Sequence, residues 1–285
     1  MKTAKKILKP IVIILLVLCV LFCFLVAPRG LGKTDMTKFH GVYAHRGYFD
    51  NGNGVPENSL AAFDAAMKKG FGIELDLQIT KDGKVVVFHD ADLERMCGVQ
   101  GKVWEYTQEE LLEMKLLDTD YTIPSLEEVL ALVDDKVPLL VEYKMDKVDT
   151  TVCQQGNAIL QEYDGDYMVQ AFDPRALLWY KKNAPEVARG LLCQEYWNDE
   201  SYAGKPLYLV LTYMVENVAV RPDFISYKHT DNDNISLKVC RLLGADTACW
   251  TLRSDEDYLA VQDEFDIYIF DSFDIGEFVH TMPEL

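Results

Sequence analysis

After residue 40, short apolar runs alternate with amphipathic, helix-like segments along almost the whole chain. The runs are four to eight residues long and rich in β-branched residues, a pattern typical of strands buried on both faces of a parallel sheet. The pattern predicts nine strands, at residues 42–45, 72–79, 84–89, 139–144, 167–172, 187–193, 223–227, 247–252 and 266–270.

Helical spacing of apolar positions fills most of the gaps between these strands. Residues that commonly cap helices precede several of the helical segments, among them Asn58, Asp173 and Ser254. The predicted helices are residues 59–69, 125–133, 150–163, 175–183, 207–216, 234–243 and 255–262.

The second and third strands are separated only by residues 80–83. A parallel crossover needs a dozen or more residues, so these two strands are predicted to form a hairpin. The remaining eight strands alternate with helices over about 245 residues, which predicts an α/β fold of the (β/α)₈ TIM barrel type. A doubly wound open sheet is the alternative. Residues 90–122 are too long for a simple connection and are predicted to be a small insertion after the second strand, beside the barrel mouth.

The N-terminal segment has a different pattern, with 17 consecutive apolar residues from Ile11 to Ala27. This length favours one transmembrane helix, and the alternatives are a cleaved signal and a buried core helix. Four lysines precede the run, so the positive-inside rule places the N-terminus in the cytoplasm. We therefore expect a single-pass protein of the cell membrane with an extracytoplasmic body.

This pattern divides the chain into two parts. Residues 1–38 form the cytoplasmic tail, the membrane anchor and a short linker, and residues 39–285 form the barrel. We expect that residues 1–38 can be deleted to leave a soluble, active barrel.

Charge supports the same division. The chain has 28 basic and 46 acidic residues, a formal charge of −18. Residues 1–38 contain seven basic residues and one acid, leaving 21 basic and 45 acidic residues in the body. This balance argues against a nucleic-acid partner.

The seven cysteines show no close pair of the kind that binds zinc, so we expect buried free thiols, with one disulfide as the alternative.

Charged residues stand at the ends of the predicted strands, where a barrel of this type carries its active site. Glu74 and Asp76 lie two apart on one strand, so both side chains leave the same face. Together with Glu142 they predict a site for a hard divalent cation, Mg²⁺ or Ca²⁺, and zinc fits this oxygen-rich set less well. The residues at these ends are His45, Arg46, Glu74, Asp76, His89, Asp90, Glu142, Lys144, Lys228, His229 and Asp271.

Two histidines are available for proton transfer near neutral pH, His45 and His89. Arg46 and Lys144 suit a phosphate group. A divalent cation, two imidazoles and two cations together indicate phosphodiester cleavage. Asp90 either caps a turn or orients the imidazole of the adjacent histidine. The other three histidines, His40, His229 and His280, are interpreted as structural.

The motifs are dense between residues 42 and 144, and in kind and order they resemble the glycerophosphodiester phosphodiesterase family. They are Tyr43-Ala-His45-Arg46-Gly47, Pro56-Glu57-Asn58-Ser59, Ile73-Glu74-Leu75-Asp76, Thr80-Lys81-Asp82-Gly83, Val87-Phe88-His89-Asp90, Ile123-Pro124-Ser125-Leu126 and Val141-Glu142-Tyr143-Lys144. The resemblance weakens later: the segment from Trp250 to Arg253 is similar to a family motif that ends in asparagine rather than arginine.

The resemblance implies a TIM barrel that hydrolyses glycerophosphodiesters to glycerol 3-phosphate and an alcohol. It implies that His45 and His89 form the acid–base pair, without saying which is the base. It further implies that Glu74, Asp76 and Glu142 bind the metal, that Arg46 and Lys144 contact the phosphate, and that Glu57 and Asn58 line the first loop.

The expected function is therefore that of a membrane-anchored hydrolase acting on small glycerophosphodiesters. Two alternatives remain open. The same fold could act on lysophospholipids or on envelope polymers of glycerol phosphate. A membrane anchor favours both substrates, but the acidic body would repel the anionic polymers unless cations screen it. An inert binding module on the same barrel is the other, since a fold alone does not specify a function.

Overall fold

The computed structural model describes residues 2–30, 33–145, 149–197, 199–202 and 204–275. Eight parallel strands pair in the order β1-β9-β8-β7-β6-β5-β4-β2, and β1 also pairs with β2, which closes the sheet into a barrel. The predicted TIM barrel is thus confirmed, and the open sheet is excluded. The strands are β1 (Gly41–Ala44), β2 (Gly72–Ile79), β4 (Leu139–Tyr143), β5 (Tyr167–Ala171), β6 (Arg189–Cys193), β7 (Phe224–Lys228), β8 (Asp246–Leu252) and β9 (Ile267–Phe270).

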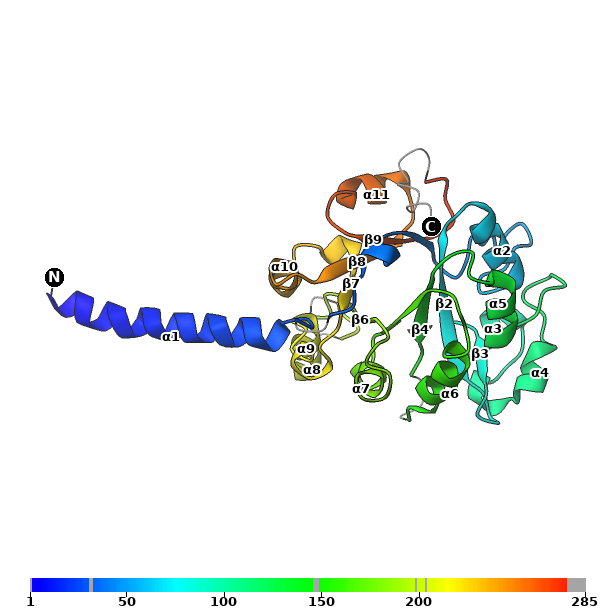
Figure 1. The fold of residues 1–285 in the computed structure, drawn as a ribbon, viewed down its shortest axis with the longest axis horizontal. Coiled ribbons are helices and arrows are strands. Elements are labelled where there is room, and N and C mark those ends of the chain that lie inside the picture. The colour runs from blue at the N-terminus through cyan, green and yellow to red at the C-terminus, as the bar shows by residue number, and fades with distance from the viewer. Residues whose placement is uncertain (1, 31–32, 146–148, 198, 203, 276–285) are drawn as a thin grey trace.

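Helices surround this barrel, as Figure 1 shows. Two of the caps expected from the sequence are present: Asp173 and Ser254 each accept a backbone N–H of the first turn of a helix. The third expectation was wrong by one residue, because the cap of the helix that starts at Leu60 is Ser59 and not Asn58. The helices around the barrel are α2 (Leu60–Lys68), α5 (Leu126–Val133), α6 (Thr151–Leu160), α7 (Pro174–Asn183), α8 (Pro206–Thr212), α9 (Asn217–Val220), α10 (Ile235–Leu242) and α11 (Asp255–Val261).

The predicted hairpin is present as β3 (Val85–Val87), which runs antiparallel to β2. The insertion that follows it contains α3 (Glu94–Cys97), a 3₁₀ turn at Val103–Glu105 and α4 (Gln108–Leu112). It has a small core of its own, built from Val86, Phe88, Leu93, Met96, Val103, Leu111, Leu116 and Ile123. This separate core makes the insertion a firm support for residues at the edge of the barrel.

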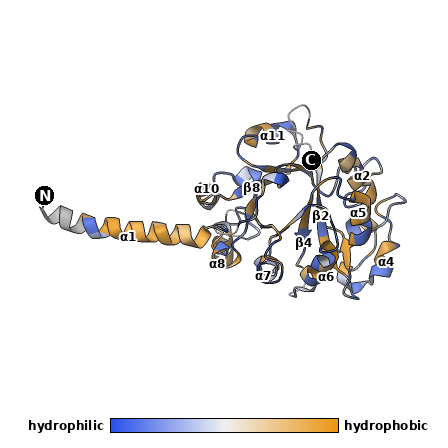
Figure 2. Ribbon diagram, in the orientation of Figure 1, coloured by the Kyte–Doolittle hydropathy of each residue, from blue (hydrophilic) through white to orange (hydrophobic). Residues whose placement is uncertain are grey.

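One long helix, α1 (Lys2–Val26), stands away from the barrel in Figure 1. Its segment Leu8–Val26 is long and apolar enough to cross a membrane, and only 6% of its most apolar window is buried. Figure 2 shows the ribbon of α1 in the hydrophobic colour along most of this segment. A core helix would need partners on every face, so the exposure of α1 argues against a core helix.

The end of α1 and the residues after it pack against the barrel. Val26 and Met36 are fully buried, and the Val26 carbonyl accepts a hydrogen bond from Asn217. The Arg29 backbone N–H donates to Pro222 at 2.8 Å, and Arg29 also forms an ion pair with Asp223. The predicted linker is therefore attached along part of its length to the end of the barrel where the strands begin.

The cysteines agree with expectation. All seven are free thiols, and Cys153, Cys193, Cys240 and Cys249 are buried. Burial raises the pKa of the Cys153 thiol to about 12, so this group stays protonated at neutral pH.

The packing of residues 22–38 distinguishes two truncations. Deletion of residues 1–21 should give a soluble, folded protein with full activity, because it leaves every contact of Val26, Arg29 and Met36 in place. Deletion of residues 1–38 should lower Tm by roughly 5–15 °C relative to the shorter truncation, because it empties buried apolar space. Thermal unfolding followed by circular dichroism measures both, and equal Tm values would show that the attached segment adds nothing to stability.

Candidate active site

Three buried carboxylates lie together at one end of the barrel. Glu74 and Asp76 point from the same face of β2, and the register of β2 and β4 places Asp76 opposite Glu142. One oxygen from each of the three lies within 4.8 Å of the other two. The structure therefore brings these three side chains together, as we expected from the sequence.

Two cations sit against this cluster. The Lys144 ammonium lies 3.0 Å from Asp76 and also bonds Glu142, and Arg46 Nε lies 3.6 Å from Asp76. Burial alone would raise the pKa of Asp76. The charges of Lys144, His89 and Arg46 outweigh the effect of burial and hold this pKa well below its ordinary value.

Glu74 is the exception in the cluster. Burial, followed by the charges of Asp76 and Glu142, raises its pKa well above the ordinary value. One carboxylate oxygen, Oε2, accepts the Arg46 backbone N–H at 3.0 Å, whereas the buried Oε1 has no hydrogen-bond partner. The cluster therefore lacks positive charge on the side of Glu74, which a divalent cation bound by oxygen ligands would provide.

The turn after β1 brings its backbone to the cluster. Arg46 has a φ of 57°, a left-handed conformation that is uncommon for a side-chain-bearing residue and is often found at functional sites. Gly47 follows with φ 78°, and a Cβ there would lie 2.7 Å from the backbone of Ala62. This tight turn aims the Arg46 N–H at Glu74, while Asn58 donates to Asp76 at 2.8 Å.

Each of the two candidate histidines is held through its Nδ1 by an aspartate. His45 Nδ1 lies 2.7 Å from Asp271, and His89 Nδ1 lies 2.7 Å from Asp90. In each ring the other nitrogen, Nε2, is therefore available to a molecule bound in the cavity. Burial lowers the pKa of His45, against the opposing effect of its hydrogen bond to Asp271.

Arg95 of the insertion links two residues that the sequence singled out. Its guanidinium donates to both oxygens of Glu57, at 2.7 and 2.9 Å, and to Asp90 at 2.6 Å. Glu57 also accepts from Arg46 at 2.7 Å. Burial raises the pKa of Glu57, but these hydrogen bonds outweigh it and lower the pKa to about 2. With its oxygens so engaged, Glu57 serves to hold Arg46 and Arg95 in place.

These side chains surround a cavity of about 130 Å³. Trp250 and Phe172 form one wall with their rings edge to face, 5.4 Å between centroids, and Trp250 Nε1 donates to the Ser226 carbonyl. The residues lining the cavity are His45, Arg46, Glu74, His89, Glu142, Lys144, Gln170, Phe172, Leu192, Trp250, Thr251, Arg253 and Ile269.

The structure thus brings most of the expected site residues to one cavity. Four others, Asp76, Glu57, Asn58 and Asp90, do not line it but contact residues that do; Asn58 does so through its backbone N–H, which donates to the Arg46 carbonyl. His229, interpreted as structural, bonds the Trp250 carbonyl through Nδ1 at 3.1 Å.

Sequence reasoning gave no role to Asp271 or to Gln78. Asp271, which was noted only as a strand-end charge, holds His45 and pairs with Arg253 at 3.0 Å. Gln78 donates to the backbone carbonyls of Phe88 and His89, which fixes the hairpin that carries the second histidine. A signal for Asp271 existed, because it directly follows a buried strand, as His45 does.

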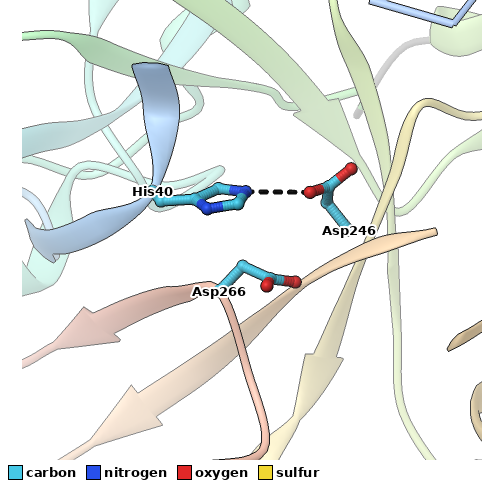
Figure 3. Close-up of side chains that lie close together, drawn as sticks. All are labelled: His40, Asp246 and Asp266. Atoms are coloured by element: carbon cyan, nitrogen blue, oxygen red, sulfur yellow. Dashed lines mark hydrogen bonds and ion pairs between the residues drawn. The ribbon is translucent and has the colours of Figure 1, made fainter. Parts of the chain in front are cut away.

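A second group of possible ligands lies at the opposite end of the strands. Figure 3 shows His40 bonded to Asp246, with Asp266 beside them. Asp246 also pairs with Lys33, and Asp266 accepts the Thr247 N–H at 2.7 Å. These partners give the group a structural explanation, consistent with the interpretation of His40.

The sequence matches the glycerophosphoryl diester phosphodiesterase family over residues 45–274. A glycerophosphodiester phosphodiesterase of Caldanaerobacter subterraneus subsp. tengcongensis is 36% identical over 198 residues, which are 61% of this chain and 79% of that protein. One of Bacillus altitudinis is 33% identical over 174 residues, covering 56% and 68% respectively.

Solved structures agree. A glycerophosphodiester phosphodiesterase of Thermotoga maritima superposes with a TM-score of 0.61 at 29% identity, covering 81% of this chain and 94% of that one. A phosphodiesterase of Oleispira antarctica, solved with the product sn-glycerol-3-phosphate, has the same fold, with a TM-score of 0.69 at 21% identity, covering 82% and 94%. With a match that spans most of its length and the barrel in common, this chain belongs to the glycerophosphoryl diester phosphodiesterase family, a family of enzymes.

Proposed function

We propose that the protein is a membrane-anchored enzyme that hydrolyses small glycerophosphodiesters to glycerol 3-phosphate and an alcohol. One observation carries the proposal: two aspartate-held histidines, two cations and a cluster of carboxylates all meet at one cavity. The product bound in the Oleispira antarctica phosphodiesterase is in keeping with this substrate class.

The histidines supply the proton transfers. One imidazole removes the proton from the substrate's own glycerol hydroxyl as that oxygen attacks phosphorus, and the other gives a proton to the alcohol oxygen as the old P–O bond breaks. Water then opens the resulting cyclic phosphate, with the two proton transfers reversed, to give glycerol 3-phosphate. Burial lowers the pKa of His45, which favours its neutral form, and we therefore assign it the role of base. His89 is then the acid.

Arg46 and Lys144 suit the phosphate. Both line the cavity, and both charges are already fixed in place by Glu57, Asp76 and Glu142. A fixed guanidinium or ammonium stabilises the negative charge of a phosphoryl group without having to reorganise during the reaction.

Glu74, Asp76 and Glu142 are suited to hold Mg²⁺ or Ca²⁺. Three observations support this site. Oε1 of Glu74 has no hydrogen-bond partner, the pKa of Glu74 is raised, and all three side chains offer oxygen ligands. A bound divalent ion supplies positive charge near the phosphoryl oxygens.

The anchor completes the proposal. The apolar length of Leu8–Val26 supports a membrane span, and the lysines before it support a cytoplasmic N-terminus with the barrel outside the cell. The predicted boundary at residue 38 then separates the anchor and linker from the catalytic barrel, with residues 90–122 as its insertion.

A substrate panel tests the proposed activity and its dependence on metal. The enzyme should release glycerol 3-phosphate from glycerophosphocholine faster than from lysophosphatidylcholine, should stop after exhaustive chelation, and should recover with Mg²⁺ or Ca²⁺. Glu74→Gln should weaken metal binding in calorimetry and lower turnover, whereas Glu109→Gln, an exposed acid on α4, should change neither. Full turnover after chelation would contradict the metal site, faster lysophospholipid turnover would favour the lipid alternative, and no release from any diester would favour a binding module.

The histidines give a second prediction. His45→Ala and His89→Ala should each lower kcat by ~10²–10⁴-fold with a smaller change in KM, because each ring moves a proton in the same transition state. The double variant should lose less than the product of the two single losses. His229→Ala serves as the control and should retain most of the activity. Near wild-type kcat in both single variants would refute the assignment.

Asp271 gives a pH-dependent prediction. Its hydrogen bond raises the pKa of His45 against the effect of burial, so Asp271→Asn should lower that pKa further. A base with a lower pKa becomes neutral at lower pH, and the acid limb of the kcat/KM profile should therefore move to lower pH. Arg253→Gln is the matched control, because it removes the ion pair with Asp271 and keeps the bond to His45. A shift of the alkaline limb instead would reverse the acid and base roles.

A further inference from the structure

A second, larger cavity lies where α1 meets the barrel. Its volume is about 720 Å³, and it is far from the catalytic residues, at the end of the barrel where the strands begin. Phe24 at the end of α1 and Ala27 directly after the helix contribute to its wall. The same wall contains four basic side chains, Arg29, Lys181, Arg189 and Arg221.

The positive charge of these four side chains is not balanced. In the described part of the chain, the one carboxylate that forms ion pairs with them is Asp223, at 3.3 Å from Arg29 and 3.7 Å from Arg189. That carboxylate also accepts the backbone N–H groups of Thr34 and Arg189. Four cations against one carboxylate give an excess of three positive charges, in a body in which acids outnumber basic residues by more than two to one.

One of the cations is buried and incompletely paired. The Arg189 side chain is 3% exposed, and its NH1 has no hydrogen-bond partner. Burial, and then the charges of Arg189 and Arg221, lower the pKa of Lys181. The cavity wall therefore offers a donor that is not used by the protein and cations that repel one another, and both features favour the binding of an anion.

The cavity also adjoins the membrane helix. Arg221 NH1 donates to the carbonyls of Phe24 and Ala27, at 3.0 and 2.8 Å, and its guanidinium lies 4.9 Å from the centre of the Phe24 ring. These contacts fix a cation at the last turn of an apolar helix, the level at which lipid headgroups lie around a membrane span.

We propose that this cavity binds the phosphate of an anionic phospholipid, held by Lys181, Arg189 and Arg221 beside the end of α1. The proposal goes beyond the catalytic function and rests on the proposed insertion of α1 into a bilayer. A lipid is favoured over a free phosphate ion because Phe24, Ala27 and Pro28 provide an apolar wall next to the cations. Such a lipid would join the barrel to the bilayer at a second point besides the helix.

Lipid retention by the full-length chain tests the proposal. The detergent-solubilised protein is incubated with equal amounts of phosphatidylglycerol and phosphatidylcholine, and the bound lipids are counted by native mass spectrometry. The wild type should retain phosphatidylglycerol preferentially. Lys181→Gln and Arg221→Gln should each reduce the preference about five-fold, the factor that corresponds to ~1 kcal/mol for one basic residue near an anionic membrane surface.

Matched variants separate a site from general charge. Lys182→Gln removes the same charge from the next residue of α7, outside the cavity wall, and should keep the preference. Lys181→Arg should keep it too, because the charge remains. Turnover of a soluble diester should be unchanged in all of these variants, which shows that each is folded.

Three results would overturn the proposal: equal retention of the two lipids by the wild type, an equal loss in Lys182→Gln, or a loss in Lys181→Arg. Displacement of phosphatidylglycerol by millimolar inorganic phosphate would likewise overturn it, by assigning the cavity to free phosphate. Flotation with vesicles of phosphatidylcholine alone tests the anchor separately, since that binding needs α1 and no anionic lipid.

Discussion

Three carboxylates buried within 4.8 Å of one another impose the main electrostatic constraint on this barrel. At that separation, two full negative charges repel by roughly 3–4 kcal/mol even at an effective dielectric constant of about 20. The register of β2 and β4 makes the crowding unavoidable, because it places Asp76 beside Glu142. The surrounding groups are arranged to offset this repulsion, and together they line the cavity beside the cluster.

The compensation extends outward from the cluster in steps. Arg46 and Lys144 contact the carboxylates directly. Glu57 then holds Arg46, and Arg95 holds Glu57 and extends to Asp90, which positions His89. The insertion therefore has a chemical function in addition to its own small core: it provides the guanidinium that ties the first loop to the second histidine. Arg95 does not line the cavity, but replacing it would affect two residues that do, Arg46 through Glu57 and His89 through Asp90.

Much of this arrangement could be read from the sequence. The strands were predictable because each is a short apolar run, and the barrel followed from their number and spacing. The residues of the cluster were predictable because polar groups at the ends of buried strands must converge. Asp271 was not assigned a role, since it lies 226 residues from His45 and local spacing does not reveal such a pair.

Two other features escaped sequence reasoning for physical reasons. Arg95 lies in an irregular insertion, where no periodicity indicates which way a side chain points. The segment after α1 was interpreted as a short linker, yet Met36 is buried and Lys33 pairs with Asp246. The composition of a segment indicates only whether it can be exposed to solvent. In this segment, contacts with the barrel determine the conformation.

The short distance between α1 and the barrel has a consequence for how the enzyme meets its substrates. Only two residues separate the last residue of α1, Val26, from Arg29, whose backbone already bonds Pro222. If α1 spans a bilayer, as we propose, no flexible stalk separates the barrel from the membrane, and the cavity stays at a constant height above the lipid surface. Soluble diesters then arrive by three-dimensional diffusion, whereas a diester confined to the membrane must find the enzyme by lateral diffusion and also rise to that height.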